Sequence, residues 1–176
     1  MTLKNKTTKL VLSAFFIALG IILPFVTMQI PSIGNMLLPM HIPILLCGFI
    51  CGGPYGFLVG LITPLLRSVL FGMPAMMPTA ISMAAELATY GLVTGVMYNR
   101  IKGKRLSIYI SLIIAMILGR MVWGVVSYGL FAALGNAFTW QIFLVQGFAN
   151  AIPGIIIQLI IIPAIMYQMR KVQVER

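Results

Sequence analysis

Acidic residues are almost absent from this chain of 176 residues, which has 12 lysines and arginines but only Glu86 and Glu175 as acids. Charged residues of all kinds make up 8% of the sequence, whereas hydrophobic residues make up 61%. Soluble globular domains are typically about one quarter charged and about half apolar. The shortage of charge therefore excludes an ordinary soluble domain and indicates an integral membrane protein.

Groups that catalysis or metal binding requires are also scarce. His41 is the only histidine, and the two cysteines, Cys47 and Cys51, lie in one short apolar segment. A zinc site needs several such ligands at close spacing, so we expect no metal and interpret the cysteines as packing residues. The sequence has no Ser–His–Asp set, HExxH motif, phosphate-binding loop or paired carboxylates. We therefore predict no enzyme and no cofactor, and an ATP-driven role would need a separate ATPase.

Ten of the 12 basic residues lie at the two ends of the chain and in the connection 99–105. This distribution follows the positive-inside rule and is not a nucleic-acid-binding face. It predicts that both termini and this connection are cytoplasmic. The residues concerned are Lys4, Lys6, Lys9, Arg100, Lys102, Lys104, Arg105, Arg170, Lys171 and Arg176.

Apolar runs separated by Gly, Pro and polar turns predict an all-α fold, a six-transmembrane-helix bundle in a single domain. A span needs about 20 apolar residues, and fewer where the segment is partly buried in protein. The predicted spans are at about 7–30, 41–51, 55–71, 78–98, 106–134 and 140–169.

Small residues one helical turn apart recur in these spans, and such pairs let helices approach closely in lipid. The pairs Gly56/Gly60 and Gly91/Gly95 are interpreted as internal packing. Ala14 and Ala18 lie near the cytoplasmic end of the first span, where contact with a partner subunit is an open alternative.

Several polar side chains interrupt the apolar spans, and Glu86 is the costliest of them. A charge within the bilayer costs a few kcal/mol unless it is paired or used. All of these residues map to the outer half of the predicted spans, so one outward-facing cavity could collect them. The candidate substrate-binding residues are Arg67, Glu86, Tyr90, Arg120, Trp123, Tyr128, Gln146 and Asn150.

A purely structural role is the alternative for the same residues. Glu86 could form a buried pair with an arginine, while Gln146 and Asn150 tie helices together. Two arginines and one glutamate would leave one positive charge, and a guanidinium matches a carboxylate well. The count favours an anionic ligand, although a neutral ligand stays possible if Arg67 is exposed at the interface.

Four segments together carry a resemblance to a known family. They are Ala14-x-x-x-Ala18, His41–Gly48, Gly56–Gly60, and Leu66-Arg67-Ser68 continued through Glu86-Leu87-Ala88-Thr89-Tyr90-Gly91. They resemble the substrate-binding S components of energy-coupling factor (ECF) vitamin transporters, and the last resembles the branch with proposed pantothenate and pyridoxine carriers. The resemblance covers nearly the whole chain.

The resemblance implies a multi-pass protein of the prokaryotic plasma membrane that captures a small vitamin from outside. It implies docking through Ala14 and Ala18 onto a transmembrane coupling subunit that is joined to two ATPases, whose ATP turnover topples the S component. The connections Pro31–Met40 and Gly72–Met77 would cover the ligand. The expected lid residues are Gly34, Asn35, His41, Gly72 and Met73.

Within this hypothesis, pantothenate is the first guess for the ligand, with pyridoxine, lipoate and nicotinate as alternatives. Arg120 and Arg67 would bind its carboxylate, and Glu86 would pair with an arginine or a ligand hydroxyl. Gln146 and Asn150 would bind its polar end. The walls would be Trp123, Tyr90 and Tyr128.

Three rival functions are weighed against this hypothesis. A stand-alone secondary transporter would use Glu86 as a proton carrier, but the chain is short and shows no inverted repeat of interrupted helices. A structural subunit without a ligand would fill the polar face with its own side chains. A membrane enzyme is disfavoured because paired acid and base groups are missing.

Overall fold

The computed structural model describes residues 5–26, 36–101, 106–136 and 139–174, and all regular elements within these ranges are helical. In chain order they are α1 (Lys6–Val26), α3 (His41–Cys51), α4 (Gly53–Phe71), the π-helical turn η1 (Met76–Ala80), α5 (Ile81–Arg100), α6 (Ser107–Ala133), α7 (Trp140–Leu144), the π-helical turn η2 (Val145–Ala149) and α8 (Ile152–Val174).

Five helical stretches of the described chain are long and apolar enough to cross a membrane, as an all-α membrane protein requires. They are Lys6–Phe25, Gly53–Phe71, Met76–Arg100, Ser107–Ala133 and Trp140–Met169. The segment expected as the second span, α3, has only 11 residues. Its length of about 16 Å is well below a hydrocarbon thickness of about 30 Å.

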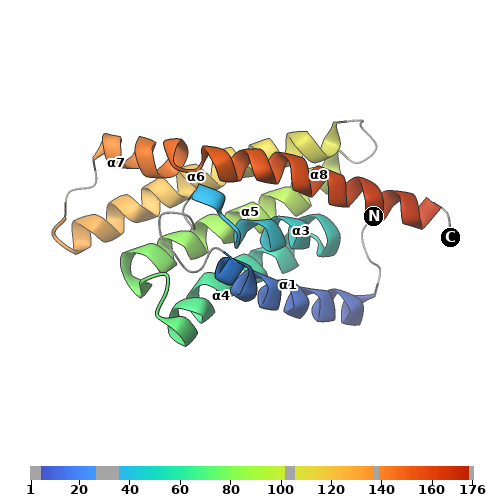
Figure 1. Ribbon diagram of the computed structural model, residues 1–176, viewed down its shortest axis with the longest axis horizontal. Coiled ribbons are helices and arrows are strands. Elements are labelled where there is room, and N and C mark those ends of the chain that lie inside the picture. The colour runs from blue at the N-terminus through green and yellow to red at the C-terminus, as the bar shows by residue number, and fades with distance from the viewer. Residues whose placement is uncertain (1–4, 27–35, 102–105, 137–138, 175–176) are drawn as a thin grey trace.

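Burial compensates for the shortness of α3. All of its residues except Ile42 are buried, so the helix is enclosed by protein and does not need to match the bilayer. Figure 1 shows α1 and α4 along one side of the bundle and α6 and α8 along the other, with α3 and α5 between them. The start of α1 and the end of α8 lie at the same end of the bundle (Figure 1).

Glycine pairs bring α4 and α5 into backbone contact. A Cβ atom added to Gly91 would overlap the Gly56 carbonyl group, and one added to Gly60 would overlap the Leu87 carbonyl group. Gly95 is packed in the same way against the backbone of Gly53. The small-residue pairs of these two helices therefore serve internal packing, as the sequence predicts.

The last predicted span is divided, whereas the sequence suggested one helix over 140–169. α7 continues into η2, a turn at Asn150 and Ala151 follows, and α8 then begins. Pro153 explains the division, because proline has no backbone N–H and its ring collides with the carbonyl four residues earlier. Near the start of α8 the same residue is well tolerated. The first part of the predicted 140–169 span is therefore a short helical segment that this turn separates from α8.

We predict that Gly91→Ala weakens the α4–α5 contact, because the new methyl group meets the Gly56 backbone. Overpacking of this kind typically costs about 1–3 kcal/mol, so thermal unfolding of the protein in detergent should begin at a lower temperature. Gly129→Ala is the matched control, since nothing lies within 4 Å of the Cβ atom it adds. Equal melting temperatures for the two variants would contradict the role of this contact.

Candidate functional site

The acidic group of Glu86 lies at the meeting point of three helices. Its Oε1 atom is 2.9 Å from Arg120 Nη1 of α6 and accepts a hydrogen bond of 2.8 Å from the Tyr90 hydroxyl, one turn further along α5. The same oxygen is 3.7 Å from Nε2 of His41, the first residue of α3. The Glu86 side chain is only 1% exposed. A buried carboxylate is thus held by one arginine and one phenol, with an imidazole nearby.

The guanidinium of Arg120 is only partly used by this arrangement. Nη1 faces Glu86, but the buried Nε and Nη2 atoms have no hydrogen-bond partner among the described residues. Both ring nitrogens of His41 and Nε2 of Gln158 are unpartnered in the same sense. Buried polar groups are nearly always hydrogen-bonded, in native proteins often to water or ligand. The unused edge of Arg120 is therefore a candidate contact for a bound molecule.

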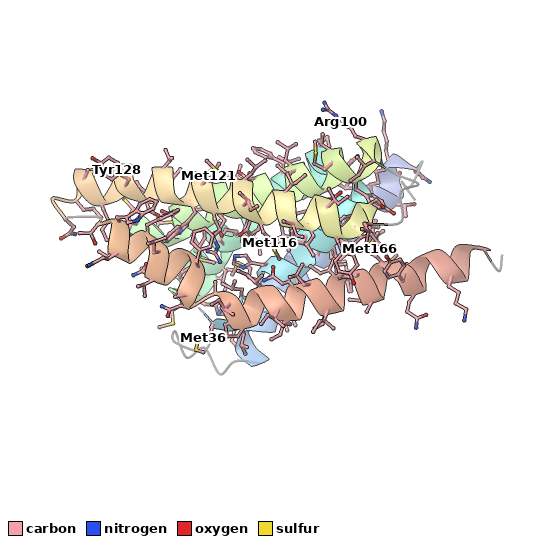
Figure 2. All side chains as sticks on the ribbon, turned by 90° about the horizontal axis from the view of Figure 1, so that it is seen from above. Met36, Arg100, Met116, Met121, Tyr128 and Met166 are labelled. Carbon is pink, nitrogen blue, oxygen red and sulfur yellow. The ribbon has the colours of Figure 1, made fainter. Side chains whose placement is uncertain are left out.

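A cavity of about 160 Å³ adjoins this cluster between α6 and α8. Figure 2 shows Met116 in the space between these two helices, where it forms part of the wall. Apart from Arg120 and Tyr90, the wall is apolar. Its remaining residues are Ile113, Met116, Ile117, Phe148, Ile155 and Leu159.

Known families provide an independent comparison. The family model described as "ECF transporter, substrate-specific component" matches residues 8–166. The chain belongs to this family. No curated protein and no solved structure matches it significantly.

Membership in the ECF family settles the general class of function. An ECF substrate-specific component is a membrane subunit that binds a small-molecule substrate for transport, and its partners are the coupling and ATPase subunits of the ECF module. The chain is therefore a transport protein and not an enzyme. Its helices agree with a multi-pass membrane protein, and no cluster of three or more His, Cys, Asp or Glu that could hold a metal occurs in the described ranges.

Three of the expected site residues, Glu86, Tyr90 and Arg120, lie together in this ECF component. Arg67 does not join them. Arg67 is 3% exposed, and its Nη1 donates a hydrogen bond of 2.7 Å to the Ile21 carbonyl of α1. Its guanidinium also packs on the rings of Phe25 and Phe71. Arg67 is therefore not among the residues that line the cavity beside Arg120 and Tyr90.

The four remaining candidate residues, which lie on α6, on η2 and in the turn after η2, are dispersed. Trp123 is buried and stacks on Phe143, with ring centroids 6.1 Å apart. Tyr128 is 64% exposed and lies on the side of α6 turned away from α8 (Figure 2). Gln146 and Asn150 are also exposed. None of these four residues is among those that line the cavity.

The expected lid residues divide into three groups. Gly34 and Asn35 lie outside the described residues. Gly72 and Met73 form an exposed turn after α4, where Gly72 has a φ of 68° that favours glycine. His41 is not a loop residue, because it begins α3, is 2% exposed and faces Glu86. The hydrophobic residues that follow His41 draw it inward with the rest of α3.

The sequence did not reveal the apolar wall of the cavity. In the sequence, Phe148, Ile155 and Leu159 resemble any other membrane-facing residues, and only the packing of the helices brings them to one cavity. Gln158 gave a signal that could have been used, since it is an amide in an otherwise apolar run. It is 1% exposed and buried on α8.

We predict that Glu86→Leu strongly destabilises the protein, because it leaves the Arg120 charge buried without a partner. Breaking such a pair typically costs about 3–5 kcal/mol, whereas replacing both partners by apolar residues is often neutral. The double variant Glu86→Leu/Arg120→Leu should therefore recover most of the loss, as measured by thermal unfolding in detergent. If the double variant is no more stable than Glu86→Leu alone, the ion pair does not have this structural role.

Proposed function

We propose that this ECF component captures a small vitamin from outside through a carboxylate that binds Arg120, with the body of the ligand in the cavity between α6 and α8. The observation that carries the proposal is the unused pair of donors, Nε and Nη2, on an arginine that lines an apolar cavity. In this proposal the protein is in a prokaryotic plasma membrane, with six spans and both termini cytoplasmic. It delivers the vitamin inward with a coupling subunit and two ATPases.

Guanidinium geometry supports a carboxylate ligand. The group is planar, and its Nε–H and one Nη2–H point the same way as a fork that can hold both oxygens of a carboxylate. Nη1 is engaged by Glu86 and leaves this fork unused. Because Glu86 balances the charge of Arg120, specificity would come from hydrogen-bond geometry more than from net charge. Glu86 then acts by orienting Arg120.

The lining of the cavity favours a ligand with an apolar body. Sequence resemblance suggests pantothenate, but the hydroxyl and amide groups of pantothenate would meet mostly aliphatic and aromatic walls. The Tyr90 hydroxyl already donates to Glu86. Burying unpaired polar groups is costly. Lipoate, which has one carboxylate on an apolar chain, fits the lining better than pantothenate, and nicotinate is intermediate.

The exposed face of α1 supports the proposed docking on the coupling subunit. Ala14 and Ala18 are both exposed. Leu10, Val11 and Phe15 are also more than half exposed. Small residues flanked by large apolar ones suit close helix contact within a membrane. We therefore retain Ala14 and Ala18 as the proposed contact with the coupling subunit.

A ligand series tests the substrate class. Purified protein in nanodiscs should bind lipoate more tightly than nicotinate and pantothenate, and should not measurably bind pyridoxine, which has no carboxylate. Lipoamide is the matched control, because it has the same apolar body with a neutral amide. Equal affinities for lipoate and lipoamide, measured by titration calorimetry, would contradict carboxylate recognition.

Arginine variants test the assignment of the binding group. Arg120→Lys should keep a positive charge near Glu86 but lose the paired donors that hold the ligand carboxylate. Hydrogen bonds to charged groups of this kind contribute about 1.5–3 kcal/mol. We expect lipoate affinity to fall roughly 10- to 100-fold. Arg67→Lys is the control, since Arg67 is bound to Ile21 at another place, and its affinity should stay within about twofold of wild type. A larger loss of lipoate affinity in Arg67→Lys than in Arg120→Lys would indicate that Arg67, and not Arg120, binds the carboxylate.

A further inference from the structure

The surroundings of His41 have an unusual balance of charge. From α5, Glu86 and Tyr90 face it, and from α6, Arg120 lies on the other side of Glu86. His41 is 2% exposed, and neither ring nitrogen has a hydrogen-bond partner among the described residues. With a neutral imidazole, the charges of Glu86 and Arg120 cancel.

No other charged group of the described chain is positioned to change this balance. On α4, Arg67 is bound to the Ile21 carbonyl. On α1, Lys9 lies over the Tyr55 ring. α8 has no charged side chain until its last turns, where Lys171 is exposed. The cluster must therefore balance any added charge with its own groups.

A carboxylate on Arg120 would upset this balance. It would add one negative charge to a buried group that is neutral without it, and an uncompensated charge in an apolar interior is strongly unfavourable. His41 is the one member that can respond by gaining a positive charge near neutral pH. Its Nε2 is 3.7 Å from Glu86 Oε1, close enough for an imidazolium to pair with Glu86.

We propose that binding of the anionic ligand is coupled to the uptake of one proton by His41. The proton comes from the solvent and adds to the unshared electron pair of the imidazole, so an N–H bond forms and no other covalent bond changes. The result is an alternating row of His41, Glu86, Arg120 and the ligand carboxylate, with two positive and two negative charges. This inference rests on the proposed function, and it makes His41 a positioning residue that acts through Glu86.

Two other groups could accept a proton during binding, and each makes a different prediction. The ligand could bind as a neutral acid, or the carboxylate of Glu86 could become protonated when the ligand takes its place on Arg120. In both cases proton uptake would persist without His41. A variant that lacks the imidazole therefore separates the three possibilities.

Titration calorimetry with lipoate tests the proposal. Binding to wild-type protein is measured near pH 7.5 in buffers of different ionisation enthalpy, which gives the number of protons taken up. We expect a value approaching one for wild type and near zero for His41→Gln. In wild type the lipoate affinity should also fall by about tenfold for each pH unit above the pKa of unliganded His41, the slope that one proton imposes, whereas the variant should show no such slope.

Because His41 is the only histidine, wild-type protein labelled at histidine and freed of any affinity tag gives a second test that needs no substitution. The imidazole NMR signals should change from neutral to imidazolium shifts when lipoate is added. Signals that stay neutral, lipoate binding without proton uptake, or uptake that persists in His41→Gln would each overturn the inference while leaving the proposed function standing. Failure of wild type to bind lipoate, with correct folding shown by its melting temperature, would overturn both.

Discussion

The buried pair of Glu86 and Arg120 is the interaction on which the inner arrangement depends. It joins α5 to α6 with a separation of 2.9 Å, and it brings the Tyr90 hydroxyl and the His41 ring into one cluster with α3. Such a pair is expensive to assemble in an apolar interior and more expensive to break. In this ECF component the pair engages only Nη1 of Arg120, a residue that also lines the cavity.

Backbone contact between α4 and α5 holds that cluster in place. Gly56 and Gly91 remove the side chains that would separate the two helices, so Glu86 is presented from a closely packed frame. α3 packs against this frame as well, because almost all of its 11 residues are buried. The closely packed part of the molecule therefore supplies His41 and Glu86, and α6 brings Arg120 to them.

The sequence predicted the membrane class, the ECF family and most helix positions, because long apolar runs and Gly–Pro turns are local signals. It also drew attention to Glu86 and Arg120 as charged residues inside apolar runs, and a buried pair of Glu86 with an arginine was one of the alternatives. It did not reveal that Arg67 of α4 bonds the Ile21 carbonyl of α1, because this contact depends on how the two helices pack. For His41, the sequence predicted the start of the second span, as observed, but not its burial against Glu86, which depends on the helices that surround α3.

The helices that line the cavity contribute different kinds of side chain. The polar members of the cluster come from α3, α5 and α6, whereas α8 contributes Ile155 and Leu159, which only shape the apolar side. Under the proposed function, substitutions on α8 would therefore alter the size and outline of the accepted molecule without disturbing the ion pair. In evolutionary terms, α6 carries Arg120 and part of the wall, whereas α8 carries wall residues only, so drift in this one helix could adapt the same scaffold to carboxylates of different shape.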